Sequence, residues 1–270
     1  AIIVIDDQSS DNTAEQALRC GATVIPGVAP PAGWSGKLWA LEQGLRAVKT
    51  PYTLLLDADI ELAPGIVSAL HQKARQENLA LVSLMAEPPM LNFIERLLMP
   101  AFIFFFKLLY PFALANKPAS RIAAAAGGCI LVETQALRLT GAFSSLQDAL
   151  IDDCTLAAHI KRAGLRTYLG LSRAARSHRG YPGLKPIWEM VARTAFTQLR
   201  YSITLLLICT LIMIAMFWAA PFAFVIVPAQ EIFLMCLLVW AAMFFTYLPT
   251  LTYYQRSPFW CLGLPVIGTL

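Results

Sequence analysis

Apolar residues are distributed unevenly along this chain. In the first 200 residues they form short runs between polar segments, and such runs occur at 2–5, 52–56 and 79–84. These runs are rich in leucine or β-branched residues, which is typical of strands buried on both faces of a sheet. Residues 201–270 are almost continuously apolar and carry only two charged side chains. The pattern predicts a folded α/β part followed by a membrane part.

Helical segments alternate with these strands. Four apolar residues recur at helical spacing within 36–49, and Ser35 precedes them as an N-cap. An earlier helix is expected from about 12 to 21, before a short strand at 23–25, and another begins near Pro64. The alternation of strand and helix predicts an α/β fold with a mainly parallel sheet.

Four more elements are expected before residue 201. Residues 122–132 predict a loop of small residues that enters a strand, and 148–163 predict a helix. A further strand is expected at 165–169 and an amphipathic, arginine-rich helix at 185–200.

The segment 91–115 is strongly apolar but contains Glu95, Arg96 and Lys107. These charges favour two helices that lie in the membrane interface over a helix that crosses the bilayer. The alternative is a true membrane span that Pro100 breaks.

Two long uncharged runs follow, at 201–230 and 232–255. Each exceeds the roughly 20 residues that a helix needs to cross a bilayer. We expect transmembrane helices at about 203–227 and 232–254, joined by a tight turn at 228–231.

Charges and chain ends add to this picture. Arg200 and Arg256 flank the hairpin of the two predicted spans on one side, and Glu231 lies on the other. Because positively charged residues favour the cytoplasmic side of a membrane, we expect the folded domain to be cytoplasmic. The protein is then a multi-pass protein of the inner (plasma) membrane. The chain begins at Ala1 within a strand and stops at Leu270 within an apolar stretch. We therefore expect sequence to be missing at both ends.

Composition supports a membrane protein. The chain is 57% hydrophobic and 14% charged, and its net charge of +4 lacks the basic stripes of nucleic-acid-binding proteins, so no nucleic acid is expected. Its six cysteines form no CxxC pair, so no zinc site is expected. We expect a folded domain over 1–200, truncated at its N-terminus and containing the interfacial segment 91–115. Truncated transmembrane helices occupy 201–270.

The first candidate for chemistry is Asp57-Ala58-Asp59, directly after the predicted strand 52–56. Two carboxylates on a turn can approach one divalent cation, and Mg²⁺ or Mn²⁺ held there would bridge to a diphosphate. Alternatively, the pair caps a helix or faces solvent. Ligands bind at the carboxyl ends of strands in such sheets, which favours a functional site.

A second acid cluster, Asp6-Asp7, follows the predicted strand 2–5. A carboxylate there could accept a hydrogen bond from a nucleobase or a ribose hydroxyl, and Asp7 is the better candidate. Turn formation and helix capping explain the same residues without a ligand. Lys37 follows a glycine-rich loop, so it could contact a phosphate or remain solvated.

The pair Asp152-Asp153 lies near the start of a predicted helix. Acids in a first turn stabilise the helix dipole, which is one interpretation. The other is catalytic: one ionised carboxylate takes a proton from an acceptor hydroxyl, and the adjacent acid raises its pKa. The residues alone leave both interpretations open.

No P-loop, G-x-S-x-G or dinucleotide-binding glycine motif is present.

Taken together, VIDDQSSDNT, LLLDADIEL, the Asp152-Asp153 pair and the arginine-rich helix resemble family 2 glycosyltransferases with a GT-A fold, up to about residue 205. The resemblance implies inverting transfer from a nucleotide-sugar donor, UDP-linked in our expectation, with Mg²⁺ or Mn²⁺ as cofactor. Asp152 replaces the glutamate usual in the family. The expected site residues are catalytic Asp153 and Asp152, donor-binding Asp6, Asp7, Lys37, Asp57 and Arg200, and metal-binding Asp57 and Asp59.

More narrowly, GWSGKLWA, AAAAGGC, DALIDDCTLA and MVARTAFTQLRYS look like the hopene-associated branch, which is related to ceramide glucosyltransferases. That branch implies a membrane lipid acceptor, with a hopanoid as one candidate. A lipid acceptor agrees with the apolar segment 91–115 and with the two predicted spans, because both would hold the site at the bilayer.

Two departures from the family matter. Many relatives carry Gln/Arg-x-x-Arg-Trp in the late helix, whereas here Arg200 is followed by Tyr201 and Gln198 is displaced by one place. This weakens an interpretation as a processive polysaccharide synthase. The family's first strand is also missing, so part of the nucleotide pocket is expected to be absent. A polyprenyl-phosphate glycosyltransferase and a non-catalytic membrane scaffold remain as alternatives.

Overall fold

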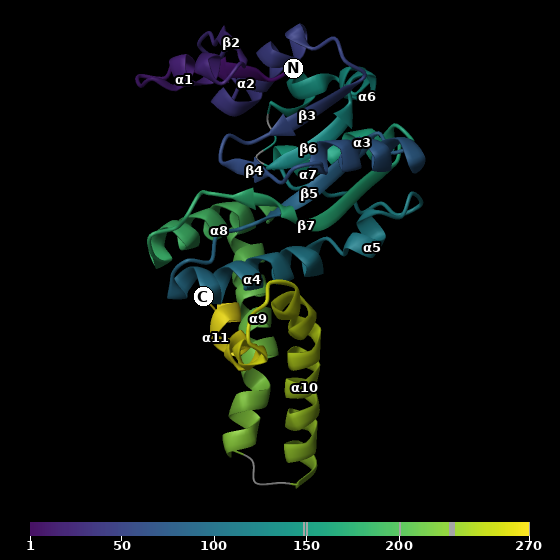
Figure 1. Cartoon of the computed structure of the whole chain (residues 1–270). Helices are drawn as coiled ribbons and strands as arrows, with labels where there is room; N and C mark the ends of the chain where they lie inside the picture. The colour runs from purple at the N-terminus through teal and green to yellow at the C-terminus, as the bar shows by residue number, and fades with distance from the viewer. Residues whose placement is uncertain (148, 150, 200, 227–229, 270) are drawn as a thin grey trace. The chain divides into compact units, whose positions relative to one another are not determined.

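The computed structural model (Figure 1) describes all residues except 148, 150, 200, 227–229 and 270. The described chain forms two compact units. The first comprises Ala1–Glu87 and Phe112–Arg176, and the second comprises Pro88–Pro111 and Ser177–Leu270. These units group segments by packing, so the predicted boundary at residue 200 between a catalytic and a membrane domain stays a prediction.

A two-stranded parallel sheet begins the first unit. Strand β1 (Ile3–Asp6) pairs with β2 (Thr23–Pro26), and helix α1 (Thr13–Arg19) connects them. Gly21 follows this helix at φ +82°, a left-handed conformation that glycine adopts readily. The predicted strand, helix and strand are therefore confirmed in this segment.

A five-stranded sheet forms the centre of the first unit, in the order β3-β6-β5-β7-β4. Its strands are β3 (Tyr52–Leu56), β4 (Ile60–Leu62), β5 (Leu81–Glu87), β6 (Cys129–Glu133) and β7 (Thr167–Ser177). Strand β6 is antiparallel to both of its neighbours, whereas β5 and β7 run parallel.

The prediction of one mainly parallel sheet is therefore wrong in two respects: the described strands form two sheets, and the larger one is mixed. The cause is the direction in which the chain enters β6. Its first residue, Cys129, pairs with Leu56, the last residue of β3. Because β6 starts at the edge where β3 ends, it has to run in the opposite direction, and local alternation of elements does not reveal this.

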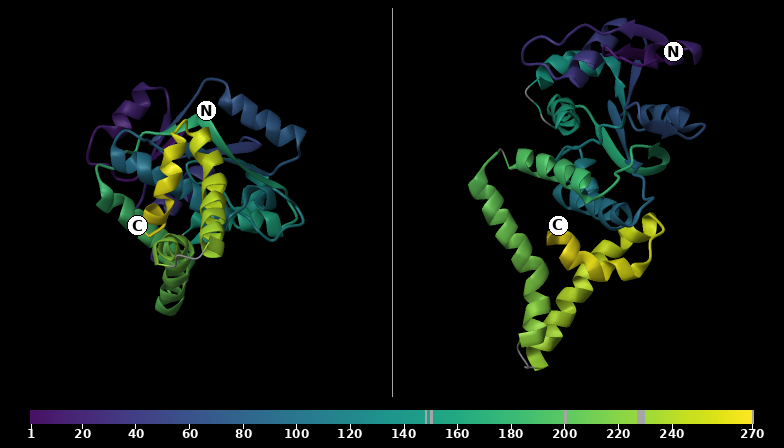
Figure 2. Two further views of the ribbon diagram at one scale, coloured as in Figure 1. Left: turned by 90° about the horizontal axis from the view of Figure 1, so that it is seen from below. Right: turned by 90° about the vertical axis from the view of Figure 1, so that its left-hand side faces the viewer.

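Helices cover both faces of the larger sheet (Figure 2). On one face, α2 (Gly36–Ala47), η1 (Ala142–Leu146) and α7 (Asp152–Arg162) share a core with inward-facing residues of β5 and β6. On the other face, α3 (Ile66–Gln76) packs against alternate residues of the same strands. The period of two along β6 serves both cores: Ile130 and Val132 face α2 and α7, whereas Leu131 faces α3.

Helix boundaries follow the predictions with one exception. The Ser35 hydroxyl accepts a hydrogen bond from Leu38 N at 3.4 Å, as expected of the N-cap of α2. The predicted helix at 148–163 begins only at Asp152, and the 3₁₀ helix η1 ends before it, at Leu146. Asp152 and Asp153 thus occupy the first turn of α7.

The predicted apolar segment 91–115 forms two helices, α4 (Phe93–Leu109) and α5 (Phe112–Ala115). Pro100 lies inside α4 and does not end it. Helix α4 belongs to the second unit, whereas α5 belongs to the first. The placement of these helices in a membrane interface stays a prediction.

The second unit also contains α8 (Leu184–Gln198), α9 (Ile203–Ile226), α10 (Gln230–Tyr253), the short η2 (Pro258–Gly263) and α11 (Leu264–Thr269). Helices α9 and α10 are the two long rods in Figure 2. Both are long and apolar enough to cross a membrane. In the most apolar stretch of α9 only 11% of the residues are buried, and in that of α10 only 22%. Most of the apolar surface of both helices is therefore exposed. The turn predicted at 228–231 lies mostly outside the described residues.

Glu95 fastens the start of α4 to the loop that follows β7. Its side chain is 1% exposed and accepts backbone hydrogen bonds from Leu91, Asn92 and Tyr181 at 2.8, 3.2 and 2.6 Å. The Asn92 side chain accepts a hydrogen bond from Glu95 N at 2.9 Å and donates one to the Tyr181 carbonyl at 2.9 Å. This capping box therefore extends to a residue distant in sequence and fixes the conformation of the loop around Tyr181.

Candidate active site

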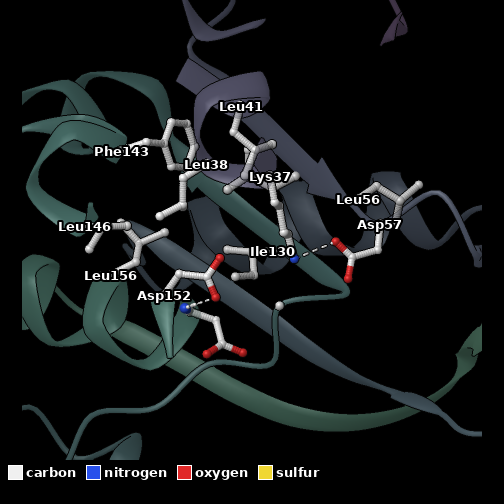
Figure 3. Close-up of a pocket in the computed structure, with 13 residues that line it drawn as sticks. Lys37, Leu38, Leu41, Leu56, Asp57, Ile130, Phe143, Leu146, Asp152 and Leu156 are labelled. Atoms are coloured by element: carbon white, nitrogen blue, oxygen red, sulfur yellow. Dashed lines mark hydrogen bonds and ion pairs between the residues drawn. The ribbon is translucent and has the colours of Figure 1, made fainter. Parts of the chain in front are cut away.

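The carboxyl end of β3 places Asp57 beside Lys37 from the first turn of α2. The Lys37 Nζ lies 2.9 Å from Asp57 Oδ1 (Figure 3). The Asp57 backbone is held because its N–H donates to the Gly128 carbonyl at 3.1 Å. Both side chains are partly exposed, so the ion pair remains open to a ligand.

Asp153, in the first turn of α7, is the acid with the most perturbed ionisation. Burial, and next the negative charge of Asp152, raise its pKa to about 6. Backbone hydrogen bonds from Cys154 and Gly127 and the charge of Lys37 oppose this shift only in part. A carboxyl group with a pKa near 6 is ionised at neutral pH but still basic enough to accept a proton from a reacting hydroxyl.

Gly127 brings Asp153 and Lys37 together. A Cβ atom at this position would lie 3.3 Å from Asp153 Oδ2 and 3.6 Å from Lys37 Nζ. Any side chain here would therefore intrude between the carboxylate and the ammonium group. With Asp57 and Asp152, these residues line one pocket whose apolar wall consists of Leu38, Leu41, Leu55, Leu56, Ile130, Phe143, Leu146 and Leu156.

Lys37 carries a stable positive charge in this pocket. Burial by itself would lower its pKa, but the hydrogen bond and charge of Asp57, together with Asp152 and Asp153, outweigh burial and raise it. A cation held next to a reactive carboxylate suits a phosphate group of a bound substrate. The pocket thus combines a group that can neutralise phosphate with a group that can take a proton.

The N-terminal acids lie near this pocket but do not line it. Asp7 Oδ2 would lie 3.0 Å from a Cβ atom at Gly36, so Asp7 sits against the start of α2, directly before Lys37. Asp6 is partly buried, and within the described chain its Oδ1 has no hydrogen-bond partner. The structure thus brings Asp7 next to the predicted phosphate-contacting lysine.

A divalent metal fits this arrangement only together with a ligand. The described residues contain no group of three or more His, Cys, Asp or Glu side chains that could hold an ion. Mg²⁺ usually binds proteins through one or two carboxylates and completes its shell with water and substrate phosphates. Asp57 and Asp59, on the turn before β4, can supply such a partial shell.

The other predicted residues are less well placed by the structure. Asp59 is partly buried but does not line the pocket around Lys37. Arg200, predicted to contact the donor diphosphate, lies outside the described residues. Its contact with the donor diphosphate stays a prediction.

Two residues near the pocket were not among the predicted site residues. One is Gly127, and the other is Ser83, whose Oγ accepts a hydrogen bond from Ala126, the residue before Gly127. The run of small residues before β6 was a usable signal, because two adjacent glycines at a strand start often mark a close approach of backbone. Ser83 gave no such signal, since a serine within an apolar strand is equally consistent with a packing position.

The fold is a mixed sheet flanked by helices, with acids at a strand end and at a helix start. The chain belongs to glycosyl transferase family 21: the model of that family matches residues 22–267. No curated protein matches the sequence significantly.

Solved structures resemble the chain at low identity. Glucosyl-3-phosphoglycerate synthase from Mycobacterium tuberculosis, in complex with phosphoglyceric acid, is 19% identical with a TM-score of 0.42, over 72% of this chain and 64% of that enzyme. Its complex with Mn²⁺, UDP and glucosyl-3-phosphoglycerate is 20% identical with a TM-score of 0.42, over 71% and 67%. Mannosyl-3-phosphoglycerate synthase from Rubrobacter xylanophilus is 17% identical with a TM-score of 0.41, over 72% and 60%.

The chain thus spans less than two thirds of the length of the first and third of these structures. Similarity at this level says nothing about its substrates. Family membership confirms the predicted class, a glycosyltransferase. The match to family 21 supports the resemblance to a family 2-type glycosyltransferase, whereas the hopene-associated branch is not part of what the match shows.

Proposed function

We propose that this protein is an inverting, metal-dependent glycosyltransferase that moves a sugar from a UDP-linked donor to a hydroxyl group of a membrane lipid. Asp153 acts as the general base. A hopanoid is one candidate acceptor. The catalytic part works at the cytoplasmic face of the inner membrane, where α9 and α10 anchor it.

The single observation that carries this proposal is the environment of Asp153. Its carboxylate is partly buried, has a pKa raised to about 6, and lies within one pocket with the Lys37–Asp57 pair. Structural helix-start acids are normally solvated and have lowered pKa values, because they interact with the helix dipole. A base for sugar transfer needs this arrangement: a carboxyl group with a raised pKa, beside a lysine ammonium group that can bind phosphate.

The residues perform the reaction as follows. Asp153 takes the proton of the acceptor hydroxyl as its oxygen attacks the anomeric carbon. The new bond forms on the face opposite the leaving group, and the bond between that carbon and the diphosphate oxygen breaks with its electron pair on the diphosphate. Lys37 stabilises that negative charge, and a metal bound at Asp57 and Asp59 would supply further charge neutralisation. Asp7 holds the nucleobase or ribose.

A lipid acceptor is supported by the second unit. Helices α9 and α10 leave most of their most apolar stretches exposed, which in water would be strongly unfavourable. Exposed apolar side chains also lie at and just before the start of α4: Leu91 is 78% and Phe93 is 65% exposed. Such surfaces are stable against lipid, so the enzyme would meet its acceptor within the bilayer.

The proposal is tested with the full-length protein in nanodiscs. UDP-sugars are screened against hydroxyl lipids, including a hopanoid and a ceramide, with polyprenyl phosphate as the competing acceptor and mass spectrometry as the readout. We expect glycosylation of a hydroxyl lipid that depends on Asp153. Transfer only to polyprenyl phosphate, without need of Asp153, would support the alternative chemistry. Failure to bind any UDP-sugar would identify a non-catalytic scaffold.

We expect Asp59→Ala to remove the metal-dependent part of UDP binding, because Mg²⁺ or Mn²⁺ would lose one of its two protein carboxylates. Calorimetry with UDP, with and without Mn²⁺, measures this, and we expect affinity to fall about 10-fold or more when metal is present. Glu77→Gln is the matched control, since Glu77 is an exposed acid paired with Lys73. Equal UDP affinity of Asp59→Ala and the natural protein would contradict the metal site.

A further inference from the structure

A buried serine in β5 holds the backbone that contacts the proposed base. Ser83 is 0% exposed, and its Oγ accepts a hydrogen bond from Ala126 N at 2.8 Å. The same hydroxyl donates to the Ala126 carbonyl at 3.1 Å. One side chain thus fixes both polar groups of a single residue in the loop before β6. These two hydrogen bonds leave the loop little freedom to shift.

The fixed residue directly precedes Gly127, whose backbone lies against the Asp153 carboxylate: a Cβ atom there would lie 3.3 Å from Asp153 Oδ2, and the Gly127 N–H helps to lower the pKa of Asp153. A second tie comes from α7, where Cys154 Sγ lies 3.5 Å from the Ala125 carbonyl. The loop is therefore held from the sheet by Ser83 and from the helix by Cys154. The position of the Gly127 N–H relative to Asp153 depends on both ties.

We propose that Ser83 is a positioning residue for sugar transfer: by fixing the Ala126–Gly127 peptide it keeps the Gly127 N–H on Asp153 and keeps the space between Asp153 and Lys37 open. This inference rests on the proposed function, because it concerns the same base. Ser83 is too deeply buried in the sheet to contact a substrate, so its effect passes through the loop.

The effect on Asp153 has a definite sign. The charged groups around this carboxylate in the described chain are Asp152 on α7, Lys37 on α2 and Asp57 at the end of β3. None of them changes when Ser83 is replaced. Loss of the Gly127 N–H removes a hydrogen bond that favours the ionised form, so protonation of Asp153 would set in at a higher pH.

The test is the pH profile of kcat/KM for Ser83→Ala in the full-length enzyme. We expect the acid limb, placed near pH 6 by Asp153, to move to higher pH by about half to one unit, the size of one net hydrogen bond. The rate loss should therefore be several-fold near pH 6 and smaller near pH 8, with the KM for the UDP-sugar nearly unchanged. Ser83→Cys, which keeps a weak hydrogen-bonding group, should restore part of the profile.

Thr134→Val is the matched control. Thr134, the first residue of α6 (Thr134–Leu139), is 4% exposed, and its Oγ1 lies 2.7 Å from Thr53 Oγ1 in β3, away from Asp153. Its loss should lower stability without moving the acid limb. An acid limb that is the same in Ser83→Ala and the natural enzyme would overturn the inference, and so would an equal shift in Thr134→Val.

If Ser83→Ala does not fold, Gly127→Ala tests the same peptide, because its methyl group would lie 3.3 Å from Asp153 Oδ2. We expect this variant also to shift the acid limb, and an unshifted limb would count against the inference. Failure of the proposed function is a separate result: Asp153→Asn would then keep its activity. An inactive Asp153→Asn beside an unshifted Ser83→Ala would reject only the role of Ser83.

Discussion

Replacement of Asp153 by asparagine should abolish sugar transfer while leaving UDP-sugar binding nearly intact. Asparagine keeps the shape of the side chain but cannot accept the acceptor's proton, and loss of a general base lowers kcat by about 10²–10⁴-fold. The Lys37–Asp57 pair that would meet the diphosphate is untouched. Initial rates and UDP affinity, measured on the same sample, separate the two effects.

The same substitution should raise stability at neutral pH. Asp153 has a folded-state pKa of about 6, above its ordinary value of 3.8, so the folded state binds the proton more tightly than the unfolded chain. The stability that this provides is fully present below about pH 4 and is lost as pH rises through 6. At pH 7 the ionised carboxylate costs stability, which partial exposure limits to roughly 1–2 kcal/mol.

Thermal unfolding at pH 7 and at pH 4 measures this difference. We expect Asp153→Asn to unfold at a higher temperature than the natural protein at pH 7 and at the same temperature at pH 4. The neighbouring Asp152→Asn is the control: it removes a like charge and should move the acid limb of the rate to lower pH without abolishing turnover. A fully active Asp153→Asn would disprove the assignment of the base.

Replacement of Glu95 by glutamine should destabilise the second unit strongly. Burial by itself would raise the pKa of Glu95, but three backbone N–H donors outweigh burial and lower it. An amide group can accept from only one side, so its NH₂ would face backbone donors inside the protein. Leaving such groups unpaired costs about 2–4 kcal/mol.

Hydrogen exchange locates this effect. The amides of Leu91, Asn92 and Tyr181 should exchange faster in Glu95→Gln, whereas those of the first unit should not change. Since the folded pKa is lowered, the contribution of Glu95 is present above about pH 4.5, its ordinary value, and disappears as pH falls. Glu189→Gln, at an exposed position 3.9 Å from Lys185, should leave exchange unaltered. Equal protection of Tyr181 in both variants would refute the prediction.

The sequence predicted the elements that depend on local pattern. The strand at 52–56, the helix capped by Ser35 and the two long apolar helices all appear in the structure with small changes at their ends. Hydrophobic periodicity and capping act within a few residues, so they can be recognised without knowing the fold. The acids at the end of β3 could be selected for the same reason.

The environment of Asp153 could not be predicted in the same way. As a pair of acids at a helix start, Asp152 and Asp153 were equally consistent with dipole stabilisation and with catalysis. Burial and contact with the Gly127 loop distinguish these interpretations, and that loop lies 26 positions earlier in the sequence. Ser83 reaches the same loop from still further away. Contacts of this kind leave no periodic signal.

By itself, therefore, the sequence determined most of the strands and helices, including the two long apolar helices, and which acids stand at their ends, but not the short strand β4. The tertiary structure decided the antiparallel direction of β6, the meeting of Asp57, Lys37 and Asp153 in one pocket, and the raised pKa of Asp153. The physical reason is the distance along the chain over which each interaction acts. Hydrogen bonding and amphipathic pattern are local properties of the chain, whereas desolvation and charge proximity arise only when distant segments pack together.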